Sequence, residues 1–178
     1  MTDQLRIALA QLNPKVGDLP GNLALGRKAV ADAVAAGADV LMLSELFLTG
    51  YFPDDLLYKR QFITDAMAAA QALVAETAGT DVVLVLPTIW QDQVGLHNAV
   101  LIAEKGKIFA LRYKHELPNN DVFYEKRYFT PGPLPLPVTI KGVPFGIPIC
   151  EDIWHPRVCD HLVREGAELL LCPNGSPY

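Results

Sequence analysis

Three side chains that could together carry out acyl transfer each follow an apolar stretch of the sequence. Cys150 follows the stretch 143–149, Lys114 follows the stretch 107–113, and Glu45 comes after a shorter apolar run and one serine. A glutamate beside a thiol can take its proton. A lysine nearby lowers the pKa of the thiol from its usual ~8.5 and stabilises negative charge on an attacked carbonyl or nitrile. These residues predict a thiol acyl-transfer site that needs no histidine.

The reaction that this set predicts is hydrolysis of a carboxamide. Attack by Cys150 would expel ammonia, Glu45 would return the proton to the leaving group, and water would then hydrolyse the thioester. The backbone N–H of Glu151 is the expected second oxyanion donor beside Lys114. The competing interpretation is that Cys150 is a buried structural thiol, because free cysteine is among the most buried residue types.

A cysteine–histidine pair is the alternative catalytic arrangement. His155 lies five residues after the candidate nucleophile and is expected at the surface or at the start of a helix. His115 neighbours Lys114 but would point the other way on an extended chain. Cys159 and Cys172 are expected to pack in the core. A thiol-redox role is disfavoured, since no resolving cysteine is near in sequence.

Apolar periodicity and turn residues predict the elements that would position these side chains. Strands are expected near 5–11, 40–43, 82–87, 98–103, 107–113, 138–140, 143–149 and 168–172, and helices near 22–36, 62–78 and 156–165. Asn22 is expected to cap the first helix. Three strand-plus-helix units in a row indicate an α/β layered fold. We expect its parallel strands to gather Glu45, Lys114 and Cys150 along one edge of a sheet.

Two polar segments are expected to surround the site. The segment 114–132 is too rich in turn residues for a regular element, yet it contains four aromatic residues. A long loop of this kind is more often functional than inert. The turn 49–55 carries Tyr51 and Phe52 and is expected either to form the rim of a pocket or to pack against the core.

Composition limits the class of protein. The chain has 178 residues, 51% of them hydrophobic, and a net charge of −5, which is typical of a globular chain with one core and disfavours a nucleic-acid partner. It has no basic leader and no run of about 20 apolar residues, so we expect a cytoplasmic protein with no membrane partner. Its three cysteines lack C-x-x-C spacing, which disfavours a disulfide framework and a metal site.

The order and context of Glu45, Lys114 and Cys150 resemble the Glu–Lys–Cys triad of the nitrilase (carbon–nitrogen hydrolase) superfamily. Four further segments resemble the glutaminase domain of glutamine-dependent NAD synthetases, namely 117–119 with 122–123, 125–129, 150–154 and 174–178. This resemblance covers the whole chain. It implies an α-β-β-α sandwich, incomplete at its C-terminal end, in which residues 1–178 form a glutaminase domain without its last part and without an ATP-binding synthetase domain.

The resemblance also implies roles for the catalytic residues. Glu45 would be the general base, Lys114 the charge stabiliser, Cys150 the nucleophile and Glu125 a second acid that shapes the site. The domain would hydrolyse glutamine to glutamate and ammonia, and the ammonia would pass to a synthetase domain or subunit that amidates nicotinic acid adenine dinucleotide. The resemblance implies no cofactor for the glutaminase domain; ATP and Mg²⁺ would serve only the synthetase domain, whose Ser-Gly-Gly motif is not in this sequence.

The glutamine pocket that the resemblance implies would be lined by Tyr51, Phe123, Glu151 and Ser176. The carboxylate of Glu151 is suited to bind the α-ammonium group of the substrate. The family commonly has a tyrosine where this chain has Asn120.

Two other functions stay open at this point. The chain could be a freestanding nitrilase-family amidase or carbamoylase, or an inactive fragment that acts as an interaction module. A sandwich without its last strands would expose a sheet edge and apolar faces, so we expect a homo-oligomer.

Overall fold

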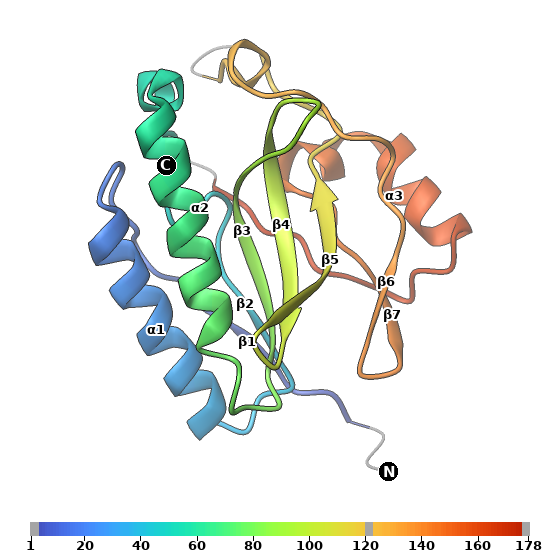
Figure 1. The fold of residues 1–178 in the computed structure, drawn as a ribbon. Helices are drawn as coiled ribbons and strands as arrows, with labels where there is room; N and C mark the ends of the chain where they lie inside the picture. Colours follow the sequence, from blue (N-terminus) through green and yellow to red (C-terminus); the bar gives the residue numbers. More distant parts are fainter. Residues whose placement is uncertain (1–3, 120–122, 176–178) are drawn as a thin grey trace.

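In the computed structural model, which describes residues 4–119 and 123–175, the chain forms four layers. Helices α1 (Leu19–Ala35) and α2 (Arg60–Ala75) cover one face of a five-stranded sheet. A three-stranded sheet lies on the other face, and α3 (Pro156–Arg164) lies outside it (Figure 1). The expected α-β-β-α sandwich is therefore confirmed.

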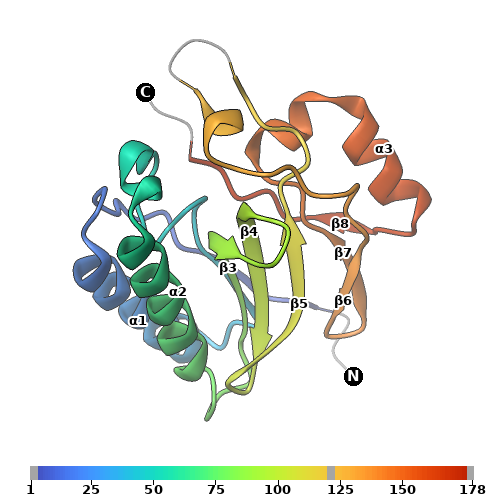
Figure 2. The same ribbon diagram turned by 45° about the horizontal axis from the view of Figure 1, so that its top comes forward.

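The order of the first sheet is β1-β2-β3-β4-β5. Its strands are β1 (Ile7–Leu9), β2 (Val40–Met42), β3 (Val83–Gln91), β4 (Leu96–Glu104) and β5 (Lys107–Tyr113). The strands β1, β2 and β3 are parallel to one another, and β4 is antiparallel to both β3 and β5. Because β2 and β5 consequently run in the same direction, the residues that follow them lie at the same end of the sheet, which is turned forward in Figure 2.

The second sheet delivers Cys150. It consists of β6 (Val138–Ile140), β7 (Val143–Gly146) and β8 (Leu169–Leu170), and β7 is antiparallel to β6 and parallel to β8. The expectation that the three candidate residues share the edge of one sheet is therefore wrong. Glu45 and Lys114 come from the first sheet and Cys150 from the second, and packing of the two sheets brings them together.

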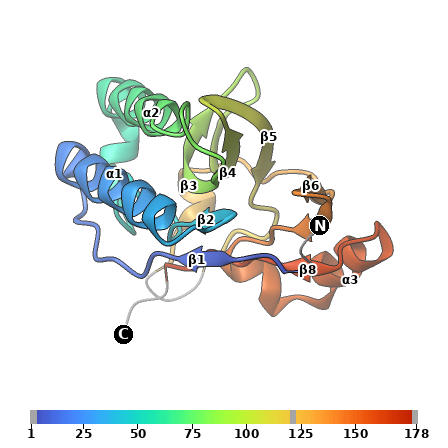
Figure 3. The same cartoon turned by 90° about the horizontal axis from the view of Figure 1, so that it is seen from below.

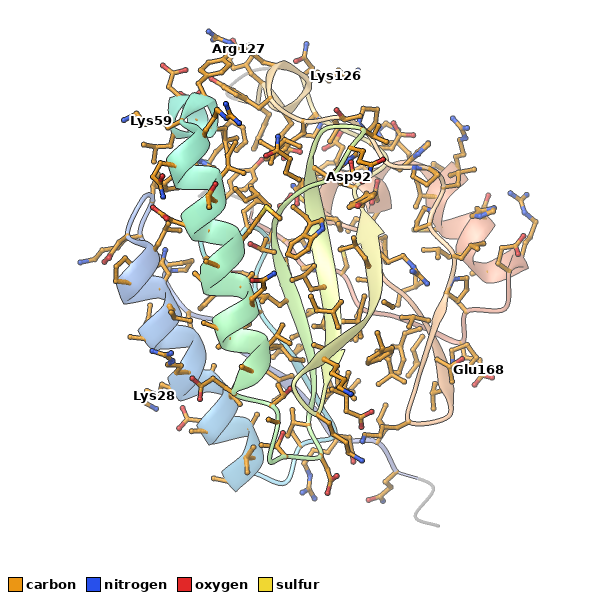
Figure 4. All side chains as sticks on the ribbon, viewed as in Figure 1. Lys28, Lys59, Asp92, Lys126, Arg127 and Glu168 are labelled. Atoms are coloured by element: carbon orange, nitrogen blue, oxygen red, sulfur yellow. The ribbon has the colours of Figure 1, made fainter. Side chains whose placement is uncertain are left out.

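The strand β3 begins with the apolar run 83–86, which is buried on both faces of the sheet. Leu84 and Leu86 pack with α1 and α2, whereas Val83 and Val85 pack with the second sheet. Alternate residues of a strand point to opposite faces, so a strand between two layers needs apolar residues at every position. Figure 4 shows side chains filling the space between α2 and the first sheet.

The start of α1 differs from the expectation. Asp18 is the capping residue and accepts a hydrogen bond from the Gly21 N–H at 3.0 Å. Asn22 lies inside the helix, where its buried side chain donates to the carbonyl oxygens of Lys15 and Leu48 at 2.7 and 2.9 Å. Asn22 therefore joins two loops instead of capping the N-terminus of α1. Its amide satisfies loop backbone groups that would otherwise be buried without partners.

Several elements are shorter than the apolar pattern predicts. The last strand covers Leu169–Leu170 rather than 168–172, and β7 ends at Gly146 although the apolar stretch continues to residue 149. Short 3-10 helices occupy Asp54–Tyr58, Glu125–Arg127 and Cys150–Trp154. An apolar run in the sequence indicates burial, not the backbone hydrogen bonds that define a strand. Buried irregular segments are therefore predicted as strands.

The strands β1 and β8 are edge strands of the two sheets in the part of the chain that the structure describes, and they lie on the same side of the molecule (Figure 3). Their side chains include exposed leucines, with Leu9 59%, Leu169 44% and Leu170 43% exposed. Within the described residues, no helix is both long and apolar enough to span a bilayer.

Candidate active site

Glu45, Lys114 and Glu125 form a fully buried ionic cluster. Lys114 Nζ lies 2.8 Å from Glu45 Oε1 and 2.8 Å from Glu125 Oε1, and all three side chains have no exposed area. Burial alone would lower the pKa of Lys114, but the two carboxylates outweigh it and raise that pKa. Buried charges are stable only when they are paired and hydrogen-bonded, so this lysine stays positively charged.

The backbone and side chains around Glu45 fix both of its carboxylate oxygens. Oε1 accepts from Lys114 and from Asn98 Nδ2, each at 2.8 Å, and Oε2 accepts from the Gly175 N–H at 2.9 Å. Leu46, which follows it, has a left-handed backbone with φ of 49°, and such strain is concentrated at functional sites. The carboxylate is therefore held in one orientation.

Glu125 lies in the short helix Glu125–Arg127 of the long loop. Its Oε1 also accepts from the Tyr51 hydroxyl at 3.0 Å. Burial and the nearby charge of Glu45 raise its pKa to about 7, against the opposing effect of Lys114. This carboxyl group can therefore change its protonation state near neutral pH, unlike an ordinary glutamate.

Cys150 opens the 3-10 helix Cys150–Trp154 with a left-handed φ of 45° and is 9% exposed. Its backbone N–H donates to the carbonyl oxygen of Pro173 at 3.0 Å. The helix α3 starts at Pro156, as predicted, and the 3-10 helix lies between it and β7. The thiol lies near enough to Glu45 for the charge of that carboxylate to act on its pKa.

The pKa of Cys150 differs from the expectation. Burial and the charge of Glu45 raise it to about 12, although Lys114 pulls it down. The expectation that the lysine lowers this pKa below its usual value is therefore wrong in net effect, because burial and the carboxylate outweigh one cation. The thiol carries its proton at neutral pH, and attack on a substrate requires a base at that moment.

Sequence reasoning missed Asn98 and the role of Asp152. Asn98 is 1% exposed and contacts both glutamates of the cluster. The fully buried Asp152 accepts from the N–H groups of His115 and Glu116 at 3.1 and 2.7 Å, and from Ile149 at 2.9 Å. Asp152 therefore joins the backbone after Lys114 to the backbone before Cys150. The sequence does contain a signal for each residue: Asn98 is a polar residue within a mainly apolar strand, and Asp152 is an acid two positions after Cys150.

We expect Asp152→Ala to lower the free energy of unfolding by about 3 kcal/mol or more, because three N–H groups, one buried and two partly buried, would lose their acceptor. Asp152→Asn keeps one acceptor oxygen and should fall between this variant and the wild type. Urea denaturation measures both. The control is Asp160→Ala, since Asp160 is exposed on α3. An Asp152→Ala protein within about 1 kcal/mol of the wild type would contradict this role.

The expected pocket residues are only partly brought together. The ring of Tyr51 lies 6.2 Å from that of Phe123, and the Tyr51 hydroxyl contacts Glu125. The side chain of Glu151 lies toward the surface, with Oε1 3.5 Å from His155 Nε2. Ser176 and Asn120 lie outside the described residues.

The backbone at Gly175 passes close to both Tyr51 and Glu45. A Cβ atom at this position would lie 2.8 Å from the Tyr51 ring, so no larger residue fits without movement. Glycine therefore allows the N–H of Gly175 to reach Glu45 while Tyr51 stays beside Glu125.

The histidines and the other cysteines have different neighbours. His115 Nδ1 lies 2.8 Å from the carbonyl oxygen of Gly132, and the side chain of His155 is half exposed near Glu151. Neither arrangement is that of a base for the thiol. Cys159 and Cys172 are partly exposed, so the expectation that they pack in the core is wrong. Burial nevertheless raises the pKa of Cys172 to about 11.

The outer side of the Glu125 loop is fixed by Arg127 and Tyr128. Arg127 Nε donates to the Tyr58 hydroxyl at 2.9 Å, and the Tyr128 hydroxyl donates to Asp55 at 3.0 Å. Lys126 and Arg127 extend outward at this end of the molecule (Figure 4). The loop therefore directs its basic residues to the surface and its glutamate into the core. Among the described residues, no cluster of three or more His, Cys, Asp or Glu side chains is arranged to hold a metal ion.

The fold and the buried cluster define a class of protein. The chain belongs to the carbon–nitrogen hydrolase family, which it matches over residues 6–178. It is 46% identical over its whole length to the glutamine-dependent NAD(+) synthetase of Rhodobacter capsulatus, and 37% identical over 98% of its length to that of Thermotoga maritima. The chain spans about a third of these relatives, 32% and 31% of their lengths.

Solved structures show the same fold. The glutamine-dependent NAD+ synthetase of Acinetobacter baumannii superposes with a TM-score of 0.89 at 31% identity, over 98% of this chain and 33% of that one. An amidase from Nesterenkonia sp. AN1 superposes with a TM-score of 0.82 at 25% identity, over 96% of this chain and 67% of that one. That amidase is a glutamate-to-glutamine mutant with acrylamide added to its active-site cysteine.

Proposed function

We propose that the chain is a glutamine amidohydrolase, the glutaminase part of a glutamine-dependent NAD synthetase. The observation that carries this proposal is the buried lysine bridging two glutamates beside a thiol that keeps its proton. Relatives with 46% and 37% identity are named glutamine-dependent NAD(+) synthetases, which supports glutamine as the substrate. The adduct on the cysteine of the similar amidase supports Cys150 as the nucleophile.

The proposed reaction has two halves. Glu45 accepts the thiol proton while the sulfur of Cys150 bonds to the amide carbon, and Lys114 stabilises the negative charge on the carbonyl oxygen. The C–N bond then breaks, and Glu45 gives the proton to the leaving nitrogen, so that ammonia departs. Water gives a proton to Glu45 and attacks the thioester. Glutamate is released, and the proton returns to the sulfur.

The other residues shape the pocket in this proposal. Glu125 and Glu45 together hold Lys114, and Tyr51 and Phe123 form an aromatic wall next to Glu125. Glu151 and Ser176 complete the glutamine-binding set, with Glu151 taking the α-ammonium group. The ammonia would amidate nicotinic acid adenine dinucleotide in a synthetase domain or subunit. ATP and Mg²⁺ would be needed for that step and not for glutamine hydrolysis.

A substrate screen tests the proposal. Release of ammonia from glutamine, with no comparable release from short aliphatic amides or carbamoyl compounds, is the expected result. Preference for simple amides would favour a freestanding amidase, which the likeness to the Nesterenkonia enzyme makes the second candidate. No ammonia from any amide, with the fold intact by circular dichroism, would favour an interaction module and contradict the proposal.

We also expect the isolated chain to self-associate through its exposed edge strands. Light scattering should give a mass above the 19.5 kDa of one chain. The double variant Leu169→Lys/Leu170→Lys should reduce this association, because charged residues on an edge strand oppose pairing. Val163→Lys, at a position 61% exposed on α3, is the control. A monomeric wild-type chain would contradict the expectation.

A further inference from the structure

The side chain of Asn98 lies between the two carboxylates of the cluster. Its Nδ2 donates to Glu45 Oε1 at 2.8 Å and makes a longer contact of 3.4 Å with Glu125 Oε2. Its backbone carbonyl accepts from the N–H of Lys114 at 2.8 Å. One residue of β4 therefore contacts all three members of the ionic cluster.

The Oδ1 atom of Asn98 supports a role for the residue in holding the carboxylates. Its Oδ1 is buried and has no hydrogen-bond partner among the described residues. An unpaired buried acceptor is unfavourable, and an apolar side chain would avoid it in a strand whose next five residues, 99–103, are apolar and fully buried. Asn98 is therefore poorly suited to a purely structural position and well suited to holding carboxylates.

The chemistry of the amide suits this place. Lys114 supplies one positive charge to two carboxylates, and a second cation would neutralise the acid–base pair completely. The amide of Asn98 instead donates hydrogen bonds without adding charge. Asn98 donates to Oε1 of Glu45 and the Gly175 N–H donates to Oε2, so both carboxylate oxygens are fixed.

We infer that Asn98 is a positioning residue, which holds the carboxylates of Glu45 and Glu125 against Lys114 in the geometry for proton transfer. The catalytic part of this inference rests on the proposed function, because it takes Glu45 as the base. The hydrogen bonds themselves do not depend on which amide is hydrolysed.

The test is a carbon NMR titration of the glutamate carboxyl groups in the full chain, with Glu125 assigned through Glu125→Gln. In the wild type, Glu125 should titrate near pH 7, since burial and Glu45 raise its pKa to about 7. Donors to the ionised form lower a pKa, and like charges raise it. Asn98→Ala should therefore raise the pKa of Glu125, and Asn98→Asp should raise it further.

The matched control is Asn22→Asp, because Asn22 is also 1% exposed but its side chain bonds to loop backbone rather than to the ionic cluster. It should lose stability and leave the titration of Glu125 unchanged. The kcat for glutamine should fall about tenfold or more in Asn98→Ala, with KM changed little, since Asn98 supports the acid–base step rather than binding.

An Asn98→Ala protein that folds, with the titration of Glu125 and the kcat both unchanged, would overturn the inference. If Asn98→Asp does not fold, Asn98→Ala decides alone. Absence of glutamine hydrolysis in the wild type would contradict the proposed function, whereas the titration would still show whether Asn98 sets the state of the carboxylates.

Discussion

Glu45→Gln is expected to lower the kcat for glutamine by at least about a thousandfold, in the range by which positioned bases accelerate reactions. The pKa of Cys150 is raised to about 12 by burial and by the charge of Glu45, so the thiol carries its proton at pH 7. Attack therefore depends on a base that removes the proton during the reaction, and Glu45 is the carboxylate whose charge acts on the thiol.

Steady-state ammonia release measures this effect. Glu104→Gln is a suitable control, because Glu104 lies at the end of β4 and pairs with Lys141 away from the cluster. Its kcat should stay within about twofold of the wild type. A Glu45→Gln protein that keeps more than a tenth of the wild-type kcat would show that the thiol does not need this base.

Lys114→Met should be the most destabilising substitution of the cluster. The change leaves two buried carboxylates without their cation, and breaking a buried ion pair in this way costs about 3–5 kcal/mol. Urea denaturation should therefore show a large fall in the free energy of unfolding. Glutamine turnover should also be lost, because the negative charge on the attacked oxygen loses its stabiliser.

A second substitution separates charge from packing. Glu125→Gln in the Lys114→Met background should restore part of the lost stability, because it removes one of the two unpaired charges. The surface pair of Lys141 with Glu104 offers the control, since Lys141→Met should cost less than about 1 kcal/mol. Equal losses for Lys114→Met and Lys141→Met would contradict an ionic role for Lys114.

Local pattern predicts much of this fold. The hairpin of β4 and β5, the buried strands β2 and β3 and the start of α3 at Pro156 lie close to where apolar periodicity and turn residues place them. Placing Glu45 and Lys114 after strands also identifies two members of the cluster, because parallel strands deliver the residues that follow them to one end of a sheet.

The parts that could not be predicted depend on contacts between distant segments. Asp152 bonds to residues 36 and 37 positions away and Asn98 to one 53 positions away, so no local pattern records these partners. The same holds for the raised pKa of Cys150, which is the sum of burial and two opposing charges. Asn22 looks like a helix cap in the sequence because its loop partner Leu48 is distant.

The most direct test of the central claim is labelling of the nucleophile. The chain is incubated with a chloroketone analogue of glutamine and its peptides are analysed by mass spectrometry. We predict one adduct, on Cys150, that glutamine suppresses and that Cys150→Ala abolishes, while the partly exposed Cys159 and Cys172 stay free. Equal labelling of the Cys150→Ala protein, or labelling that glutamine does not suppress, would contradict a glutamine-directed thiol at position 150.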